Sequence, residues 1–362
     1  MAKLGDFISP AKNIKCGDGK YPVLSMTMHD GIVLQSDRFK KSLASADQSG
    51  YKVVDYGQLV VGFPIDEGVL YLQRVIEQGI MSPAYNVWDV DYSHVDPSYF
   101  ELSLHSPQAM QYYKENLRGS TARRRSLPKE VLLELPLKMP SMDEQKRVAT
   151  SIDKLTHLID MRSKQLDKLD ELVKSRFIEM FGDPVCNPKG WLLKRFDSIC
   201  ENLDSQRIPI ASAERKVGPY PYYGASGIVD YVENYIFDED LLLISEDGAN
   251  LVMRSTPIAF SISGKTWVNN HAHVVRFEHL STQKYIEMCF ELRDISDSIT
   301  GSAQPKFNQA KLNEILFPLP PLDLQNQFAD FVAQVDKSKL AVQKSLEQLE
   351  ILKKALMQEY FG

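Results

Sequence analysis

The sequence predicts an α+β fold with two globular domains, each followed by a long helix, and it predicts that the two helices pair as an antiparallel intramolecular coiled coil. Two observations support this prediction. A segment of about forty residues with helical periodicity occurs in the middle of the chain and again at its end. The chain ahead of each copy has the glycines, aromatic residues and short apolar runs that are typical of small sheets.

The two helical segments are copies of one repeat. Residues 140–182 align without a gap with residues 320–362, at an offset of 180 residues. Similarity at a fixed offset indicates one structural unit that is used twice. The identical pairs include Pro140/Pro320, Asp143/Asp323, Gln145/Gln325, Leu166/Leu346, Leu169/Leu349, Glu179/Glu359 and the closing Phe-Gly.

Apolar residues in both segments are spaced alternately by four and three positions, as the seam of a coiled coil requires. They are Val148, Ile152, Leu155, Ile159, Leu166, Leu169, Val173 and Met180 in the first segment, and Phe328, Val332, Val335, Val342, Leu346, Leu349, Leu356 and Tyr360 in the second. Arg162, Arg176, Lys339 and Lys353 interrupt the series, and polar seam residues of this kind select register and partner. The alternative is a pair of core helices in a globular fold.

Each predicted helix has a start or stop signal. Ser141 is placed to cap the first helix, with Glu144 three residues later as its capping-box partner, and Asp323 is placed to cap the second. Gly182 and Pro184 end the first helix. At 1.5 Å per residue, each helix is a rod of roughly 60 Å.

We divide the chain into a first domain (1–139), a central long helix (140–182), a second domain (185–319) and a C-terminal long helix (320–362). In both domains we expect a twisted, mostly antiparallel sheet with helices. The predicted strands include 51–54, 58–62, 241–244, 258–262 and 273–277, and the predicted helices lie near 106–116 and 282–292.

Composition excludes several classes of protein. A chain of 362 residues with 43% hydrophobic residues suits two or three folded domains. The four cysteines are far apart in sequence, which argues against a zinc site or a disulfide framework. The sequence has no apolar run of membrane length and no signal-peptide pattern, so we expect a cytoplasmic protein without a membrane partner. The net charge of −6 suggests that other subunits supply part of any positive surface.

Motifs for catalysis or cofactor binding are weak. Residues 263–266 read Ser-Gly-Lys-Thr, but Ala259 stands where a phosphate-binding loop needs glycine, and no helical pattern follows. His271 and His273 alternate on a predicted strand without a third metal ligand nearby in sequence. We therefore expect a chain that is not an enzyme by itself and that binds no cofactor or metal.

Residues suited to DNA binding are better represented. Four arginines lie within residues 118–125, and the arginine fork fits both phosphates and guanine edges. Residues 300–306 occupy the matching place in the second domain. The predicted DNA-binding residues are Arg118, Ser120, Arg123, Arg124, Arg125, Tyr222, Tyr223, Ser226, Lys265, Trp267, Asn269, Asn270, His271, Ser302, Gln304 and Lys306. The alternative is a solvated charged turn for the arginines, and core packing for Trp267 and the tyrosines.

These residues belong to strings that resemble the specificity subunits of type I restriction–modification systems. The strings are Pro-Tyr-Tyr-Gly-Ala-Ser-Gly (221–227), Leu-Ile-Ser-Glu-Asp-Gly-Ala-Asn (243–250), Lys-Thr-Trp-Val-Asn-Asn-His-Ala-His (265–273), Gly-Ser-Ala-Gln-Pro-Lys (301–306), Pro-Leu-Pro-Pro-Leu-x-x-Gln (318–325) and Phe-Gly-Asp-Pro (181–184). Each string alone is weak, whereas the combination is specific and the resemblance covers the whole chain.

The resemblance implies that each globular domain is a target-recognition domain for one half of a bipartite, asymmetric target in double-stranded DNA. It implies that the helix pair sets the half-site spacing and docks two methyltransferase subunits, which methylate adenine with S-adenosylmethionine that they bind themselves. Motor-nuclease subunits that use ATP and Mg join where the host has them. The chain itself then contributes recognition to the complex rather than chemistry.

The first domain departs from the pattern, because it lacks the strings at 221–227 and 265–273 and offers Gly-Ile-Met-Ser-Pro-Ala-Tyr (79–85) and the arginines instead. Site residues therefore cannot be mapped between the halves from sequence. In the repeat, Leu324 stands where the first copy has Glu144. Two other classes compete: a coiled-coil scaffold or inhibitor without DNA binding, and a stand-alone nuclease or methyltransferase.

Overall fold

The computed structural model describes residues 2–28, 30–38, 47–117, 127–301 and 304–362. The chain divides into two units, of which unit 1 comprises Met1–Arg162 and Ser345–Gly362 and unit 2 comprises Ser163–Lys344. Each unit thus holds one globular domain, the beginning of one long helix and the end of the other. Among the described residues, we find no helix with the length and apolar character needed to cross a membrane.

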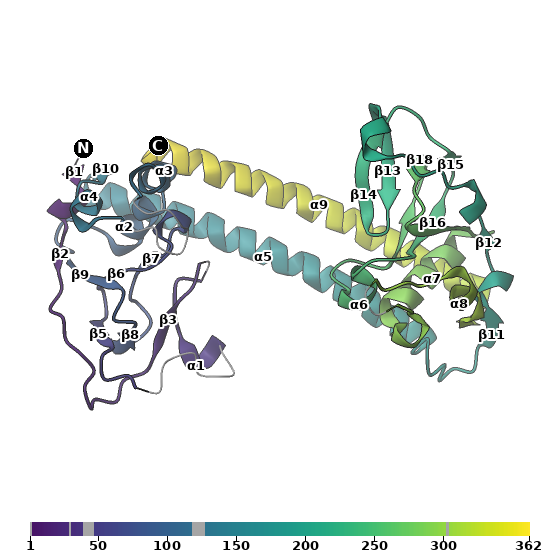
Figure 1. Ribbon diagram of the computed structural model, residues 1–362, viewed down its shortest axis with the longest axis horizontal. Coiled ribbons are helices and arrows are strands. Elements are labelled where there is room, and N and C mark those ends of the chain that lie inside the picture. The colour runs from purple at the N-terminus through teal and green to yellow at the C-terminus, as the bar shows by residue number, and fades with distance from the viewer. Residues whose placement is uncertain (1, 29, 39–46, 118–126, 302–303) are drawn as a thin grey trace. The chain divides into compact units, whose positions relative to one another are not determined.

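The two long helices are α5 (Met142–Phe181) and α9 (Leu322–Phe361), each of 40 residues. They match the two copies of the sequence repeat. Inside unit 2, Asp170 of α5 pairs with Lys339 of α9 at 2.5 Å, and the ring centroid of Phe177 lies 5.4 Å from that of Phe328. Rising numbers in one helix meet falling numbers in the other, so the helices run antiparallel, as predicted (Figure 1).

The residues of the predicted seam are all buried or half-buried. The four cations that interrupt the seam are half-buried too. The guanidinium of Arg176, for example, lies 5.9 Å from the ring centroid of Phe331. Large apolar residues off the seam, such as Met161 and Ile351, are more than half exposed. The spacing of the apolar residues therefore identified the buried stripe of both helices correctly.

Unit 2 contains the strands that precede α9 and the helices that pack on them. The strands are β11 (Leu192–Arg195), β12 (Glu201–Asn202), β13 (Val217–Gly224), β14 (Gly227–Val232), β15 (Phe237–Asp238), β16 (Leu241–Ser245), β17 (Ala259–Ile262), β18 (Lys265–Val268), β19 (Ala272–Arg276) and β20 (Leu316–Leu319). The helices are α6 (Asn250–Met253), α7 (Leu280–Leu292) and α8 (Gln309–Glu314). The predicted strands 241–244, 258–262 and 273–277 and the predicted helix 282–292 are confirmed.

Unit 1 contains the corresponding elements ahead of α5. The strands are β1 (Ala2–Lys3), β2 (Ile8–Pro10), β3 (Leu24–Met26), β4 (Ile32–Leu34), β5 (Lys52–Asp55), β6 (Leu59–Val61), β7 (Leu70–Leu72), β8 (Gln78–Met81), β9 (Asn86–Val90) and β10 (Pro136–Leu137). The helices are α1 (Gln35–Arg38), α2 (Pro97–Leu104), α3 (Pro107–Asn116) and α4 (Lys129–Leu133). The predicted strands 51–54 and 58–62 and the predicted helix 106–116 are confirmed.

The two units share one strand order although their sequences differ. The main sheet of unit 2 has the order β12-β19-β16-β17, and that of unit 1 has the order β2-β9-β6-β7, with antiparallel neighbours throughout. In β19, Val275 pairs with both neighbouring strands, and in β9 Trp88 does the same. Val275 and Trp88 therefore occupy equivalent positions.

The smaller sheets follow the same register. Counting back from Trp88 and Val275 without a gap makes Met81, at the end of β8, equivalent to Val268, at the end of β18. Both residues are fully buried. The pair Asp55–Gln78 then corresponds to the pair Asp238–Lys265. The structure thus supplies the residue-by-residue mapping between the halves that the sequence did not provide.

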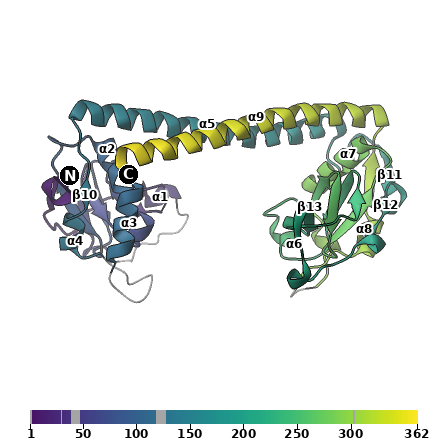
Figure 2. The same cartoon turned by 90° about the horizontal axis from the view of Figure 1, so that it is seen from above.

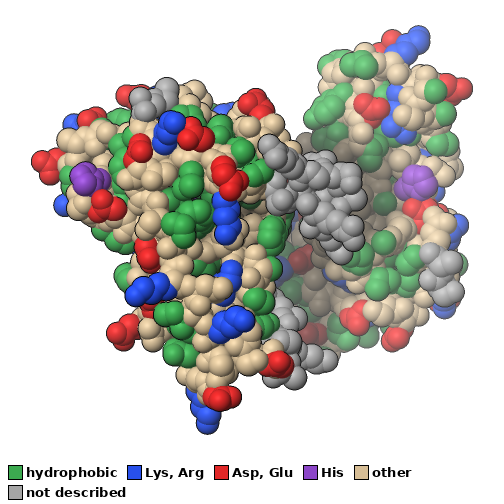
Figure 3. Space-filling view, turned by 60° about the vertical axis from the view of Figure 1, so that its left-hand side comes forward, with side chains coloured by type: hydrophobic (Ala, Val, Ile, Leu, Met, Phe, Trp, Pro, Cys, Tyr) green, Lys and Arg blue, Asp and Glu red, His purple; other side chains and the backbone are tan. Residues whose placement is uncertain are grey.

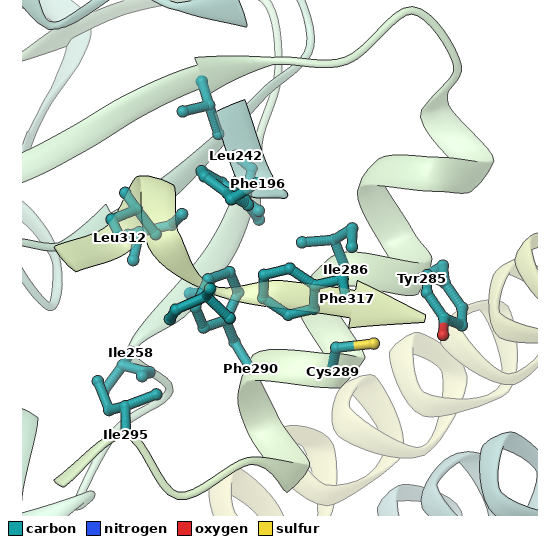
Figure 4. Packing of buried hydrophobic residues seen from close by; sticks show 14 of the residues in the cluster. Phe196, Leu242, Ile258, Tyr285, Ile286, Cys289, Phe290, Ile295, Leu312 and Phe317 are labelled. Carbon is teal, nitrogen blue, oxygen red and sulfur yellow. The ribbon is translucent and has the colours of Figure 1, made fainter. Parts of the chain in front are cut away.

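The core of unit 2 joins its sheet to the long helices through α7 (Figure 2). Figure 4 shows Ile286, Cys289 and Phe290 of α7 against Phe196, Leu242 and Phe317. Tyr285 of α7 donates its hydroxyl to the carbonyl of Pro318, 2.7 Å away, and its ring stacks on that of Phe177 in α5. Burying these large side chains fixes the sheet on the helix pair.

One glutamine of the repeat anchors each long helix to its own domain. Gln145 donates to the carbonyls of Pro140 and His94 and accepts from the amide of Asp96, at 2.9 to 3.1 Å. Gln325 donates to the carbonyl of Pro320 and accepts from the hydroxyl of Thr282, both at 2.7 Å. Both glutamines are at most 2% exposed. Their identity in the repeat is therefore explained by contacts inside the chain.

The predicted caps of the long helices are only partly confirmed, because α9 begins at Leu322 and Asp323 lies inside its first turn rather than at the cap. The Ser141 hydroxyl accepts a long bond from the amide of Glu144, at 3.4 Å, while the Glu144 carboxylate pairs with Arg147 rather than closing a capping box. Gly182 follows the end of α5 with a φ of 79°, a conformation that favours glycine, which confirms the predicted stop.

Candidate nucleic-acid interface

Four segments of unit 2 meet at one end of β16 and β18. They are the β13–β14 turn (225–226), the segment after β16 (246–250), the β18–β19 loop (269–271) and the segment 300–307, of which residues 302 and 303 lie outside the described residues. We call these four segments the loop cluster. It contains parts of all four strings in this half of the chain that resemble target-recognition motifs.

Backbone hydrogen bonds join the segments of the loop cluster. The amide of Glu246 donates to the carbonyl of His271 at 2.9 Å, and the amide of Phe307 donates to the carbonyl of Glu246 at 2.8 Å. The Ser245 hydroxyl donates to the carbonyl of Ala225, and the amide of Asn269 donates to the carbonyl of Tyr223 at 3.0 Å. Because loops bonded in this way lose little freedom on binding, they suit a preorganised recognition surface.

The segment 300–307 closes on itself. The backbone amides and carbonyls of Thr300 and Lys306 exchange two hydrogen bonds, of 2.8 and 2.7 Å. Gly301 has a φ of 83°, and a side chain there would bring its Cβ within 2.5 Å of the carbonyl oxygen of Gln304. Only glycine fits this turn without strain, which explains the glycine that begins the string at 301–306.

A group of charged residues, buried or half-buried, lies beneath the loop cluster. Asp204, Arg207, Glu246 and His273 come from three distant parts of the chain. Arg207 donates to the Glu246 carboxylate at 2.6 Å and to the carbonyl of Ala272 at 2.7 Å. His273, which is 1% exposed, contacts Asp204 through Nδ1 at 2.6 Å. Breaking one partner of a buried charge pair is costly, so this charge network holds the loops in one conformation.

The pKa of Asp204 follows from its partners. Burial alone raises the pKa of Asp204, but the hydrogen bond and charge of His273, the Val274 amide and Arg207 outweigh it and lower the pKa overall. The other nitrogen of His273, Nε2, lies 2.8 Å from the carbonyl oxygen of Phe307. Both ring nitrogens of His273 therefore face oxygen atoms inside the domain.

Three residues of the charge network have the side-chain types of metal ligands. Asp204, Glu246 and His273 offer ligand atoms within 4.8 Å of one another. Both nitrogens of His273 already contact oxygen atoms, and the Arg207 guanidinium donates to the Glu246 carboxylate. A cation placed here would displace these bonds and face the guanidinium, so the residues fit a structural charge network better than a metal ion.

Several predicted DNA-binding residues are exposed on the loop cluster. Ser226, Asn270, His271, Gln304 and Lys306 all have exposed side chains. The His271 ring is oriented by the Asp247 carboxylate, 2.9 Å from Nδ1. Hydroxyl, amide, imidazole and ammonium groups on one rigid surface are suited to hydrogen bonds with base edges and phosphates.

Other predicted residues support the surface from below. Tyr222 is 1% exposed, accepts from the amide of Ile210 at 3.0 Å, and packs under the Arg215 guanidinium. Asn269 is 6% exposed and accepts from the amide of His271. The half-buried Trp267 donates its indole N–H to the carbonyl of Ile208 at 2.6 Å. Tyr222 and Asn269 are therefore buried inside the domain, where the Tyr222 hydroxyl and the Asn269 Oδ1 each accept a backbone amide.

Two further predicted residues are separate from the exposed set. Tyr223 is half-buried and packs on the core beside Phe260. Lys265 begins β18, at the end of the strand away from the loop cluster, and its ammonium group lies 4.8 Å from the ring centroid of Tyr235. At about 3.3 Å per residue, Lys265 lies roughly 13 Å along the strand from Asn269. The structure therefore does not bring Lys265 to the loop cluster.

The remaining predicted residues lie outside the described residues. They are Arg118, Ser120, Arg123, Arg124, Arg125 and Ser302. Sequence reasoning missed the charge network, apart from noting His273 as a weak metal candidate. Arg207 and Glu246 are 39 positions apart and Asp204 and His273 are 69 positions apart, so no local spacing links these pairs. Asp247 was inside a quoted string, but nothing in the sequence indicated that it orients His271.

Known protein families provide an independent comparison. Residues 188–351 match the model of the type I restriction modification DNA specificity domain. A putative type I restriction enzyme specificity subunit of Haemophilus influenzae is 33% identical over 134 residues, which span 37% of this chain and 34% of that protein. The MjaVIII type I restriction enzyme specificity subunit of Methanocaldococcus jannaschii is 22% identical, over 99% of this chain and 90% of the relative.

Solved structures show the same fold. The type I restriction–modification S subunit from M. genitalium aligns over 99% of this chain and 95% of its own, with a TM-score of 0.60 and 14% identity. A chain from a structural study of type I R-M complex assembly and conformational transition aligns with a TM-score of 0.59 and 14% identity, over 99% and 96% of the two chains. Both likenesses cover the long helices as well as the two domains.

Proposed function

This chain belongs to the family of type I restriction–modification specificity subunits, and we propose that it reads a bipartite, asymmetric DNA target. Each domain reads one half-site, and the antiparallel helix pair sets the distance between the half-sites. The observation that carries this proposal is the loop cluster of unit 2, where exposed polar side chains lie above the half-buried charge network. Rigid donors and acceptors at one surface are what base-edge readout requires.

We further propose that chemistry belongs to partner chains. Two methyltransferase subunits dock on the helix pair and methylate adenine with their own S-adenosylmethionine, and a motor-nuclease subunit with ATP and Mg joins in a host that has one. Apolar side chains that are exposed off the seam, such as Met161 and Ile351, are available for such docking. A role on chromosomal DNA places the chain in the cytoplasm.

The proposal is tested first by mapping methylated adenines in the host genome with and without this chain. We expect one split motif to lose its methylation when the chain is absent. A scaffold or inhibitor without DNA binding predicts an unchanged motif. Methyl transfer by the purified chain alone would refute the assignment of chemistry to partners.

The loop cluster is tested on a duplex that carries the mapped motif. Lys306→Ala should weaken binding of the assembled complex and reduce the slope of log affinity against log salt by about one, as expected for one lost phosphate contact. Lys216 is a matched control, because it is an exposed lysine at the other end of β13, paired with Glu233. Equal salt slopes for both variants would contradict contact between Lys306 and a phosphate.

A further inference from the structure

The shared register shows which part of unit 1 corresponds to the loop cluster. Counting from the equivalent pair Trp88 and Val275, Tyr85 takes the place of Ala272 and Ala84 that of His271. Counting along β6 and β16 in the same way, Gly62 takes the place of Ser245, and Phe63 that of Glu246. The polar positions of unit 2 are therefore occupied in unit 1 by residues without charge.

These positions form a continuous apolar surface in unit 1. The ring centroids of Phe63 and Tyr85 are 6.1 Å apart. A Cβ added at Gly62 would lie 2.9 Å from the sulfur of Met26 and 3.3 Å from the Tyr85 ring, so both side chains converge over this glycine. Phe63 is 44% exposed, and Met28, in the adjoining turn, is 46% exposed. We call Met26, Phe63 and Tyr85 the apolar ledge.

A basic pocket lies beside the apolar ledge. Lys52 donates to the carbonyl of Tyr85 at 2.5 Å, and it lines a cavity of about 130 Å³ together with Lys12, Lys129 and the neighbouring Asn86. Burial lowers the pKa of Lys52, and the charge of Lys129 lowers it further. Trp88 lines the same cavity and is 2% exposed, and among the described residues its indole N–H has no acceptor.

These neighbours favour DNA over protein as the ligand of the apolar ledge. Three lysines around one cavity are suited to a phosphate. Figure 3 shows hydrophobic side chains at the surface of unit 1 interspersed with both basic and acidic side chains. Aromatic and aliphatic groups beside a phosphate site match a DNA-reading surface that contacts bases mainly through apolar contacts.

We propose that the apolar ledge reads thymine C5-methyl groups in the half-site assigned to unit 1, while Lys12, Lys52 and Lys129 hold a backbone phosphate. Thymine is the base that presents a methyl group in the major groove, and apolar side chains recognise it by contact. This inference rests on the proposed function and adds to it a chemical division of labour. Unit 2 reads by hydrogen bonds, and unit 1 reads largely by methyl contact.

The test replaces thymine by deoxyuridine in one half-site at a time of the mapped motif. Deoxyuridine keeps every hydrogen-bonding group and lacks only the methyl. For the full chain assembled with its methyltransferase partner, we expect about fourfold weaker binding per contacted methyl in one half-site, from the usual worth of a buried methylene. Little change is expected in the other half-site. This scan needs no protein variant.

A protein variant then assigns the effect to the apolar ledge. In Phe63→Ala, uracil substitution should cost nothing further in the sensitive half-site. Tyr56→Ala is the matched control, because Tyr56 is 61% exposed and lies before β6, at the strand end opposite Phe63. It should keep the full uracil effect.

The outcomes separate the inference from the function on which it rests. Absence of any sequence-specific binding by the assembled complex would overturn both. Specific binding with no uracil effect in either half-site, or with an equal effect in Phe63→Ala, would overturn the inference alone. So would a Phe63→Ala variant that loses its methyltransferase partner but not its DNA target, since the apolar ledge would then be a protein-docking surface.

Discussion

Unit 1 and unit 2 have one strand register and two different ways of supporting the surface at its end. In unit 2, the charge network of Asp204, Arg207, Glu246 and His273 lies under the loop cluster. In unit 1, the register places Phe63 at the position of Glu246, and Met26 and Tyr85 pack over Gly62. The two units therefore share the strand pairing of the sheet, whereas the side chains at the ends of the strands are charged in one unit and apolar in the other.

The largest effect is expected from breaking the charge network. Arg207→Ala leaves Glu246 without its 2.6 Å partner at a site where the arginine side chain is only 13% exposed. The free energy of unfolding of unit 2 should fall by about 3–5 kcal/mol. Denaturant unfolding, followed by a probe in each unit, measures whether the loss is confined to unit 2.

Arg276→Ala is the control for this variant. Its ion pairs with Glu201 and Glu239 have similar geometry, but the arginine side chain is 41% exposed, so the loss should be at most about 1 kcal/mol. Equal losses for the two arginines would show that burial of the charge network contributes nothing, and the contrast between the units would disappear.

A smaller loss of stability, equal in the two units, is expected at the glutamines that anchor the long helices. Gln145→Ala and Gln325→Ala each leave buried backbone or hydroxyl groups without a partner. Each variant should lower the free energy of unfolding by about 1–3 kcal/mol. Thermal or denaturant unfolding of both variants measures this, with the exposed Gln343→Ala as a neutral helix control. A loss confined to one of the two glutamines would contradict their equivalence.

The smallest expected effect is a loss of stability of unit 2 at low pH. The pKa of Asp204 is lower in the folded chain than its ordinary value of about 3.9. Its ionised form therefore stabilises unit 2 above that value, and this stability is lost as the pH falls through the lowered pKa. Unfolding measured between about pH 5 and pH 2 should show this loss in unit 2. In Asp204→Asn, that part of the acid dependence should be absent, and a pH profile identical to that of the unaltered chain would refute it.

The sequence predicted the long helices well because their signals are local. Seam spacing, a gapless repeat and Gly182 specify where α5 and α9 lie and which stripe they bury, and no distant contact is needed to interpret them. The strings at 243–250, 265–273 and 301–306 likewise located the loop cluster, because turns and strand ends depend on neighbouring residues.

Local spacing did not predict whether a polar side chain is exposed or buried inside the domain. Tyr222, Asn269 and His271 all lie in strings that indicate recognition, yet only His271 is exposed. Whether a polar side chain points outward or bonds inside the domain is decided by the strands packed against it. Lys265 illustrates the same limit, because its position at the far end of β18 depends on where the strand begins.

Sequence alone was sufficient for the class of the fold, the repeat, the buried seam and the regions of the loop cluster, since each depends on residues close together in the chain. Tertiary structure alone determined the charge network and the equivalence of the two units. Asp204 and His273 are 69 positions apart, and the match of Phe63 to Glu246 exists only through strand pairing. Hydrogen-bonded register, rather than residue type, relates two halves whose sequences differ.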